Sequence, residues 1–426
     1  MERLALFLVL VLAPHTKFPA FDWVYPFRPA DLVLLGSALI FLRWGGRSNR
    51  LFVATPEMFF VFILAMLSAL WGGYLLDEIN LDAVEVGDTL VPYFQVAAKK
   101  LMLIFICFIG FQWILSTTSQ SNSKILKAWY LGLLIAVILH SLSYLVTADY
   151  FAVRAGVFME GNHGGSYYLL SFFIMWFARQ QGLNFGRGGM VVAFFGLILS
   201  QSTSALLFFF PLVIVTFFLL PTRLRNPMIR WRFIFVAGFS IAVLLAMFSD
   251  EIIAKIFGDE LNSLSFSRFD RLASIASGMN MFYDHWIFGV GIQGYAFALP
   301  NYVDPFIEEF FDWNSRRIAN NIYVEWLAEQ GAIGAFAMLL LLYKIIKPVF
   351  SNFRKGAILV AGTVSIILSW LAFPSYTVSF HWIGFAVLVR LAKQSNIAPI
   401  SVPFSMRKEV STHRQTPLLS DAQANP

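Results

Sequence analysis

Two pairs of arginine residues in a long polar segment, residues 250–320, are the side chains that most clearly suggest chemistry. Arg268 and Arg271 begin a helical pattern in this segment, and Arg316 and Arg317 stand near its end. A planar guanidinium group offers phosphate two parallel, charge-assisted hydrogen bonds, and a helix N-terminus adds positive potential. Arg268 and Arg271 are therefore candidates for binding a diphosphate, with anchoring to anionic lipid headgroups as the alternative interpretation.

A polar stripe follows the second arginine pair into an apolar run. Every fourth residue is polar or charged, so these side chains share one face if the run is helical: Arg317, Asn321, Glu325 and Glu329. Ionisable groups in a membrane span normally face the bundle interior or a water-filled cavity, and two glutamates one turn apart repel unless a cation lies between them. We interpret the stripe as functional; a structural carboxylate, paired with arginine or capping backbone groups, is the alternative. Asn320 and Tyr323 lie beside it.

A third polar cluster precedes another apolar run. It consists of Arg154, Glu160, Asn162 and His163, set among small residues in the sequence RAGVFMEGNHGG. A single histidine in a loop is usually just solvated, but here a carboxylate stands three residues away and glycines allow close approach. Contact with a substrate is the functional interpretation of this cluster.

Other patterns do not point to a site. Residues 289–294, GVGIQG, match the dinucleotide fingerprint, but the βαβ unit that this motif requires is missing, so a flexible turn is predicted. The six histidines lack zinc-site spacing. Cys107, the one cysteine, stands in an apolar run and is expected to pack as a small hydrophobic side chain.

Membrane helices must position these residues. Of the 426 residues, 58% are hydrophobic and only 13% are charged, whereas soluble proteins carry roughly 25% charged residues. The net charge of +6 could suggest nucleic acid, but the basic residues form short clusters between apolar runs, so no nucleic-acid partner is expected. The composition predicts an all-α, polytopic membrane protein.

Twelve spans are predicted, with an uncleaved first span rather than a signal peptide. They begin near Leu4, Ala30, Glu57, Lys100, Leu126, Gly164, Gly189, Ala205, Phe233, Ile322, Lys355 and Thr377. The predicted organisation is an N-terminal transmembrane bundle of about nine spans (1–249), a large periplasmic loop (250–320), C-terminal transmembrane helices (321–393) and a cytoplasmic tail (394–426). The tail is polar and expected to be disordered.

The charge distribution predicts the orientation. With both termini cytoplasmic, the cytoplasmic segments hold 21 of the 31 basic residues and only four of the 25 acidic ones. This is the positive-inside pattern of bacterial inner-membrane proteins. All three polar clusters then lie on the periplasmic side.

An amphipathic helix is predicted inside the large loop, capped by Ser265 or Ser267. Its apolar face would carry the residues spaced like one side of a helix: Arg268, Leu272, Ile275, Met279 and Phe282. Such a helix could lie on the membrane surface, which would bring its arginines close to the lipid headgroups.

The late part of the chain resembles a known family. The segments SRFDRLASIASGMNMFYDHWIFGVGIQGY and RRIANNIYVEWLAEQGAIGAF are similar to the shared block of the O-antigen ligase/polymerase family of membrane glycosyltransferases, of Wzy and WaaL type. Upstream, RAGVFMEGNHGGSYYLL resembles the family's segment before a span. These motifs cover about a quarter of the chain.

The resemblance implies a GT-C-like helical bundle that transfers a saccharide from an undecaprenyl-diphosphate carrier at the outer face of the inner membrane. It implies neither a nucleotide sugar nor a metal or other cofactor, and it suggests a chain-length regulator and a flippase as partners. A polymerase of O-antigen, capsule or exopolysaccharide repeat units is the preferred interpretation. The alternatives are an O-antigen ligase, a flippase of lipid-linked oligosaccharides and a non-catalytic assembly protein.

The resemblance also suggests roles for the clusters. Arg268 and Arg317 would stabilise the leaving diphosphate, helped by Arg154, Arg271 and Arg316. Glu325 and Glu329 would serve the acceptor hydroxyl, with Glu160 and His163 as alternative bases. The family commonly has histidine where this chain has Asn320, so a histidine base at this position is excluded, which weakens the ligase interpretation more than the polymerase one.

Overall fold

The computed structural model describes residues 2–16, 29–44, 55–78, 83–86, 89–116, 121–146, 155–158, 161–219, 238, 263–303, 319–351, 353, 356–372 and 378–395. Within these ranges the chain is helical apart from a small antiparallel hairpin. The elements are α1 (Glu2–Leu12), α2 (Pro29–Trp44), α3 (Thr55–Glu78), β1 (Ala83–Val86), β2 (Thr89–Pro92), α4 (Tyr93–Ser116), α5 (Asn122–Val146), α7 (Gly161–Gln180), α8 (Phe185–Leu199), α9 (Thr203–Leu219), α12 (Ser263–Asp284), α13 (Tyr295–Ala298), η2 (Leu299–Asn301), α15 (Ile322–Phe350), α16 (Ala357–Ala372) and α17 (Ser379–Ser395).

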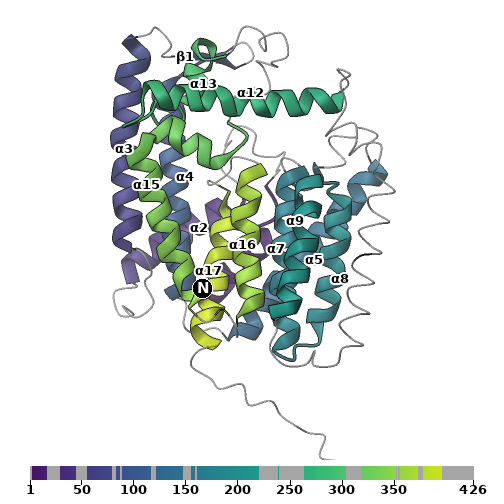
Figure 1. Ribbon diagram of the computed structural model, residues 1–426. Helices are drawn as coiled ribbons and strands as arrows, with labels where there is room; N and C mark the ends of the chain where they lie inside the picture. Colours follow the sequence, from purple (N-terminus) through teal and green to yellow (C-terminus); the bar gives the residue numbers. More distant parts are fainter. Residues whose placement is uncertain are drawn as a thin grey trace, which may run out of the picture.

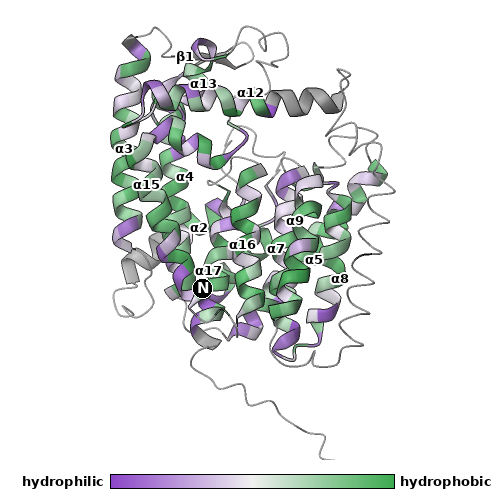
Figure 2. Ribbon diagram, in the orientation of Figure 1, coloured by the Kyte–Doolittle hydropathy of each residue, from purple (hydrophilic) through white to green (hydrophobic). Residues whose placement is uncertain are grey.

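The long helices run side by side in one bundle, and α12 lies across one end of it, almost perpendicular to the others (Figure 1). The hairpin β1–β2 lies at this end too, which we call the α12 end. Figure 2 shows hydrophobic residues along the middle of the bundle helices and hydrophilic residues towards their ends. Large apolar side chains such as Phe59, Leu207 and Phe336 are more than 60% exposed, as expected where lipid replaces water.

Among the described residues, four helices are long and apolar enough to cross a membrane, namely α3, α4, α5 and α15. Helices α1, α8, α9 and α16 are shorter apolar helices. The predicted all-α membrane protein is therefore confirmed, whereas the predicted number of twelve spans is not. Helices occupy eleven of the twelve predicted positions. The position near Phe233 lies outside the described residues, as does the tail after Ser395, and the domain boundaries stay predictions.

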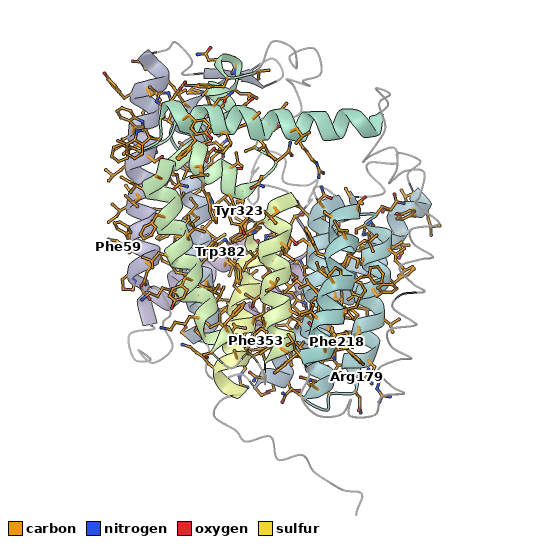
Figure 3. All side chains as sticks on the ribbon, in the orientation of Figure 1. Phe59, Arg179, Phe218, Tyr323, Phe353 and Trp382 are labelled. Carbon is orange, nitrogen blue, oxygen red and sulfur yellow. The ribbon has the colours of Figure 1, made fainter. Side chains whose placement is uncertain are left out.

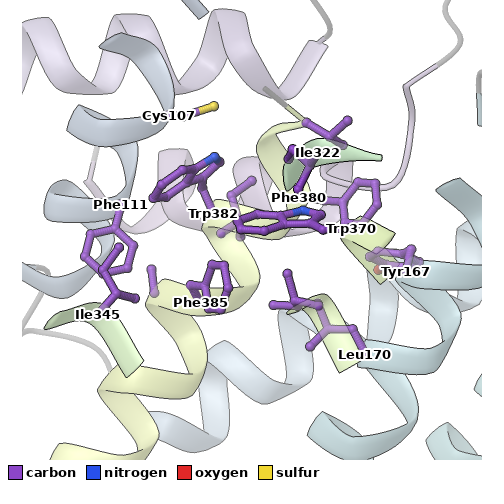
Figure 4. Close-up of a cluster of buried hydrophobic side chains, with 14 of the residues drawn as sticks. Cys107, Phe111, Tyr167, Leu170, Ile322, Ile345, Trp370, Phe380, Trp382 and Phe385 are labelled. Carbon is purple, nitrogen blue, oxygen red and sulfur yellow. The ribbon is translucent and has the colours of Figure 1, made fainter. Parts of the chain in front are cut away.

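Helix α17 forms the centre of the bundle. It is apolar around most of its circumference and is buried from Ser379 to Ala392. A helix that is hydrophobic on all sides is expected to lie in the protein interior. Helix α17 packs against α4, α15 and α16. Trp382 and Phe385 of α17 meet Phe111 and Trp370 in an aromatic cluster (Figure 4), and such edge-to-face pairs add about 0.5–1.5 kcal/mol each beyond burial.

Helix α12 differs from the prediction in where it begins and in which face it packs. It starts at Ser263, before both predicted caps. The face that packs on the protein consists of four small residues, Ala273, Ser274, Ser277 and Gly278, together with Met281. The predicted apolar face lies on the opposite side, with Leu272 53% exposed. Small side chains allow close approach, because a Cβ at Gly278 would lie 2.6 Å from Cγ1 of Val324 in α15.

Candidate functional site

Helix α15 is broken one third of the way along its length. Gly331 has φ 62° and ψ −166°, so the helix divides into a first half, residues 322–330, and a second half that begins at Ala332. This backbone conformation is essentially restricted to glycine. A broken helix leaves carbonyl and N–H groups without partners inside the bundle, and these must be satisfied locally.

The segment 286–291 satisfies them. Val290 N–H donates to Ala328 O at 2.8 Å, Gly291 N–H donates to Glu329 O at 3.0 Å, and Ala332 N–H donates to Trp286 O at 2.7 Å. Residues 286–291, which we call the plug, therefore fill the helix break. The GVGIQG motif begins within the plug, and the prediction that it forms a turn is confirmed.

Glycine is required in this plug because the backbones touch. Gly289 and Gly291 have φ 69° and 96°, and a Cβ at Gly291 would lie 2.4 Å from Cα of Gly72 in α3. Helix α3 contacts both sides of the break, because Trp71 Nε1 donates to Gly289 O of the plug and Ser68 Oγ donates to Glu329 O of α15, each at 3.0 Å.

A buried ion cluster lies beside this break. Lys100 Nζ of α4 forms an ion pair with Glu325 Oε1 and lies 3.5 Å from Glu329 Oε2. Lys100 is 8% exposed, and the two glutamates are 2% and 1% exposed. The cation that the spacing of the two glutamates requires is thus supplied by another helix.

Sequence reasoning missed Lys100. The sequence did carry a sign of this lysine's role. Lys99 and Lys100 directly precede a run of 23 uncharged residues, from Leu101 to Ser123. A buried lysine in an apolar helix needs a partner. Which carboxylates it meets, more than 200 residues later in the chain, follows only from how α4 packs against α15.

The start of α15 differs from the predicted stripe. Asn321 has extended backbone angles and caps the helix, its side chain accepting hydrogen bonds from the N–H groups of Tyr323 and Val324 at 2.9 and 3.3 Å. The helical face therefore contains Glu325 and Glu329 but not Asn321, and the prediction of a four-residue stripe is wrong in this respect. Arg316 and Arg317 lie outside the described residues.

Asn320 joins the start of α15 to α12. Its φ is 52°, and its side-chain amide donates to Ser274 Oγ at 3.2 Å. The hydroxyl of Tyr295 in α13 donates to the carbonyl oxygen of the same serine at 2.7 Å. Tyr323 lies just below α12 (Figure 3), and its hydroxyl donates to Ile367 O of α16 at 3.1 Å.

The arginines of α12 are only partly described. Arg271 lies in α12 and is half-buried, one turn before Ser274. Arg268 belongs to the same helix, but its side chain lies outside the described part of the structure. The geometry therefore joins Asn320, Asn321, Tyr323, Glu325 and Glu329 at the α12 end and brings the backbone of α12 beside them.

The third cluster lies at the start of α7, also at the α12 end. His163 is buried in the first turn of this helix, and Asn162 Oδ1 accepts a hydrogen bond from Ser202 Oγ at 3.1 Å. Arg154 and Glu160 lie outside the described residues, so their predicted contact with His163 stays a prediction.

A buried chain of contacts connects α7 to α15. Ser166 of α7 lies 2.8 Å from His381 Nε2, and Trp370 Nε1 donates to His381 Nδ1 at 3.1 Å. The Trp370 ring meets the Trp326 ring at a centroid distance of 5.8 Å, and Trp326 follows Glu325 directly. The polar residues at the start of α7 and those at the start of α15 thus belong to one packed region.

One titratable pair lies outside the membrane-spanning helices, in the segment after α12. His285 Nε2 lies 3.0 Å from the Tyr302 hydroxyl. Burial lowers the pKa of His285, and the charge of Asp284 opposes this. Burial, followed by Asp284, raises the pKa of Tyr302 to about 12. Both groups are therefore neutral near pH 7, which suits a hydrogen bond between them.

The ion cluster lies where a proton could be exchanged at one end of a membrane bundle. Two buried carboxylates share one ammonium group, which is an arrangement in which a proton can be held or released. In the described ranges, no group of three His, Cys, Asp or Glu side chains is placed to bind a metal ion.

Comparison with known proteins identifies the family of this region. Residues 188–340 match the protein-family model described as O-antigen ligase. This confirms the resemblance to the O-antigen ligase/polymerase family. No curated protein matches the chain. The matched residues include α12, the plug and the first half of α15, so the family domain contains both glutamates of the ion cluster.

Proposed function

We propose that this membrane protein, with its O-antigen ligase domain at residues 188–340, is a polymerase of lipid-linked polysaccharide repeat units. It would transfer a glycan from undecaprenyl diphosphate to an acceptor sugar at the outer face of the bacterial inner membrane. The observation that carries this proposal is the overlap of the family domain with the polar, ion-bearing α12 end of a helical bundle.

The proposed reaction needs two kinds of side chain. The acceptor hydroxyl attacks the anomeric carbon while the bond from this carbon to the diphosphate oxygen breaks, and the lipid diphosphate leaves with the electron pair. Arginine residues would stabilise this growing negative charge, and we assign this role to Arg268 and Arg317, with help from Arg154, Arg271 and Arg316. A carboxylate would accept the proton of the hydroxyl, for which Glu325 and Glu329 are the candidates.

The remaining polar residues of the clusters identified in the sequence would bind sugar. Hydroxyl-rich substrates are recognised through amide, imidazole and phenol groups, and we assign this role to Glu160, Asn162, His163, Asn320, Asn321 and Tyr323. The inner-membrane location, with both termini cytoplasmic and the segment 250–320 periplasmic, belongs to the same proposal and is supported by the distribution of basic residues.

An O-antigen ligase is the second candidate, because this is how the matching family model is described. Asn320 favours the polymerase, because the ligases resemble one another most strongly at this position, where they have a histidine. Deletion of the gene distinguishes the two. Loss of long chains with single repeat units retained on the lipid core indicates a polymerase, whereas accumulation of lipid-linked polymer indicates a ligase. Accumulation of single lipid-linked units on the cytoplasmic face would indicate a flippase instead.

Arginine variants test the proposed site in the deletion strain. Arg268→Ala and Arg317→Ala are expected to abolish polymer without lowering the amount of protein, because the carrier diphosphate loses its cations. Arg187→Ala, an exposed arginine in α8, is the matched control and should restore polymer fully. Unchanged long-chain polysaccharide in both site variants would contradict the assignment.

A further inference from the structure

We infer that Glu325 is the proton acceptor for the incoming sugar hydroxyl and that Lys100 is the positioning residue that keeps this carboxylate ionised. The inference rests on the proposed function and assigns a role within it to Lys100, a residue far from the family domain in sequence. It is carried by the ion cluster of Lys100, Glu325 and Glu329 at the break in α15.

Charge balance determines how many protons the cluster holds. One ammonium group faces two carboxylates, and all three side chains are less than 9% exposed. A net charge at such a position is strongly disfavoured, so the cluster is balanced when the two carboxylates hold one proton between them. Glu325 is in direct contact with Lys100, whereas Glu329 lies 3.5 Å away. The charge of Lys100 therefore compensates Glu325 most directly, and Glu329 is the less compensated carboxylate of the two.

The two oxygens of Glu325 differ in their surroundings. Its Oε1 atom is occupied by Lys100 Nζ, and its Oε2 atom is buried without a hydrogen-bond partner among the described residues. An ionised carboxylate accepts hydrogen bonds with both oxygens, and leaving one of them unsatisfied in a buried position is unfavourable. A bound hydroxyl would supply the missing donor.

The position of Glu325 along α15 distinguishes it from Glu329. Glu325 lies in the first turn of the half-helix, where its N–H bonds to Asn321 O, and thus close to the α12 end. Glu329 lies one turn deeper, at the helix break, where the plug and Ser68 cover its backbone. A substrate that arrives from the α12 end reaches Glu325 first.

Few other groups can exchange a proton here. Besides Lys100 and Glu325, the described ionisable side chains that the neighbouring helices bring to this region include Tyr93, Lys99, Arg271, Tyr295, Tyr323, Glu329 and His381. Helix α16 has no ionisable residue, and those of α3, Glu57, Asp77 and Glu78, stand near its ends, with Tyr74 exposed. His381 is unsuitable as a base, because Trp370 donates to its Nδ1 atom and the ring proton on Nε2 points to Ser166.

The proton transfer balances without a further reactant. The acceptor oxygen forms its bond to the anomeric carbon, its proton moves to Glu325 Oε2, and the diphosphate leaves with the electrons of the broken bond. Protonated Glu325 then returns its proton to water at the α12 end as the product leaves. Lys100 touches no reacting atom, and the return of the proton to water restores the charge balance of the cluster.

The test uses the full-length protein in lipid nanodiscs and lipid-linked repeat units extracted from the deletion strain. Turnover is measured against pH, and binding is measured with undecaprenyl diphosphate itself. Glu325→Gln should lower turnover by about 10²–10⁴-fold, the usual contribution of a general base, while carrier binding changes less than about twofold. Glu329→Gln should retain far more turnover than Glu325→Gln.

The Lys100 variants separate positioning from folding. Without the cation, Glu325 ionises only at higher pH, so Lys100→Met should move the acidic limb of the pH–rate profile upwards by at least about one unit, and Lys100→Arg should restore it. Lys99→Met, at the adjacent position, is the matched control and should leave the profile unchanged.

Three results would overturn the inference: turnover of Glu325→Gln within about threefold of wild type, well short of a general-base effect; an unmoved pH profile in Lys100→Met; or loss of carrier binding in Glu325→Gln. If the Lys100→Met protein does not accumulate, the turnover of Glu325→Gln compared with that of Glu329→Gln decides whether Glu325 is the proton acceptor. Failure of the wild-type protein to bind undecaprenyl diphosphate would instead reject the proposed function.

Discussion

The broken helix α15 gives the most direct structural prediction, which concerns Gly331→Ala. A Cβ at this position would lie 2.3 Å from the carbonyl oxygen of Ile287 in the plug, and the backbone angles, φ 62° and ψ −166°, are unsuitable for alanine. The substitution must therefore either strain the break or push the plug away from it.

The magnitude follows from these two effects. A non-glycine residue in such a backbone conformation costs about 1–3 kcal/mol. Displacement of the plug would break the hydrogen bonds from Val290, Gly291 and Ala332, each of which contributes about 0.5–1.5 kcal/mol net. Gly331→Ala should therefore lower the free energy of unfolding by about 3–7 kcal/mol if both effects operate.

Two glycines elsewhere serve as controls. Gly182 has φ 78° but open space around the added methyl group, so Gly182→Ala should cost only the backbone strain of about 1–2 kcal/mol. Gly36 is an exposed helical glycine, also with open space, and Gly36→Ala should stabilise by up to about 1 kcal/mol. Chemical unfolding in mixed micelles should rank the variants Gly36→Ala, wild type, Gly182→Ala and Gly331→Ala, from most to least stable.

The comparison between the two strained positions decides whether the reasoning holds. If Gly331→Ala unfolds at the same denaturant concentration as Gly182→Ala, the contact between plug and helix break contributes nothing, and the plug is merely a loop that lies nearby. A Gly331→Ala protein as stable as wild type would refute the broken geometry of α15 altogether.

Three further predictions concern the segments around the site. Asn321→Ala removes the cap of α15 and should destabilise the protein by about 1 kcal/mol, while Asn321→Asp should restore it; equal unfolding midpoints for all three proteins would argue against the cap. The pKa of His285 is lowered in the folded state, so the folded state binds fewer protons and stability should fall as the pH drops below the ordinary value of 6.5. Thermal unfolding at several pH values should show this dependence in wild type and less of it in His285→Gln. A reporter fused near Asp284 should be active on the periplasmic side, and cytoplasmic activity would reverse the proposed orientation.

Much of the fold could be predicted from the sequence because lipid imposes a simple rule on it. A span must be long, apolar and hydrogen-bonded within itself, so the positions of most helices follow from runs of apolar residues. The face by which α12 packs could not be predicted in this way. Hydrophobic periodicity indicated Leu272 and its neighbours, but the contact with α15 is made through Gly278 and the small residues beside it, since the side chain of Val324 packs there and leaves no room for a larger residue.

The candidate site divides in the same manner. The sequence by itself determined that Glu325 and Glu329, one helical turn apart in an apolar run, needed a cation, and that GVGIQG was a turn rather than a nucleotide site. Only the tertiary structure decided that the cation is Lys100 and that the turn closes a break in α15. The physical reason is that repulsion between neighbouring charges is a local property of the chain. The cation that relieves this repulsion is brought by helix packing between segments more than 200 residues apart, and such packing cannot be predicted from residue spacing along the sequence.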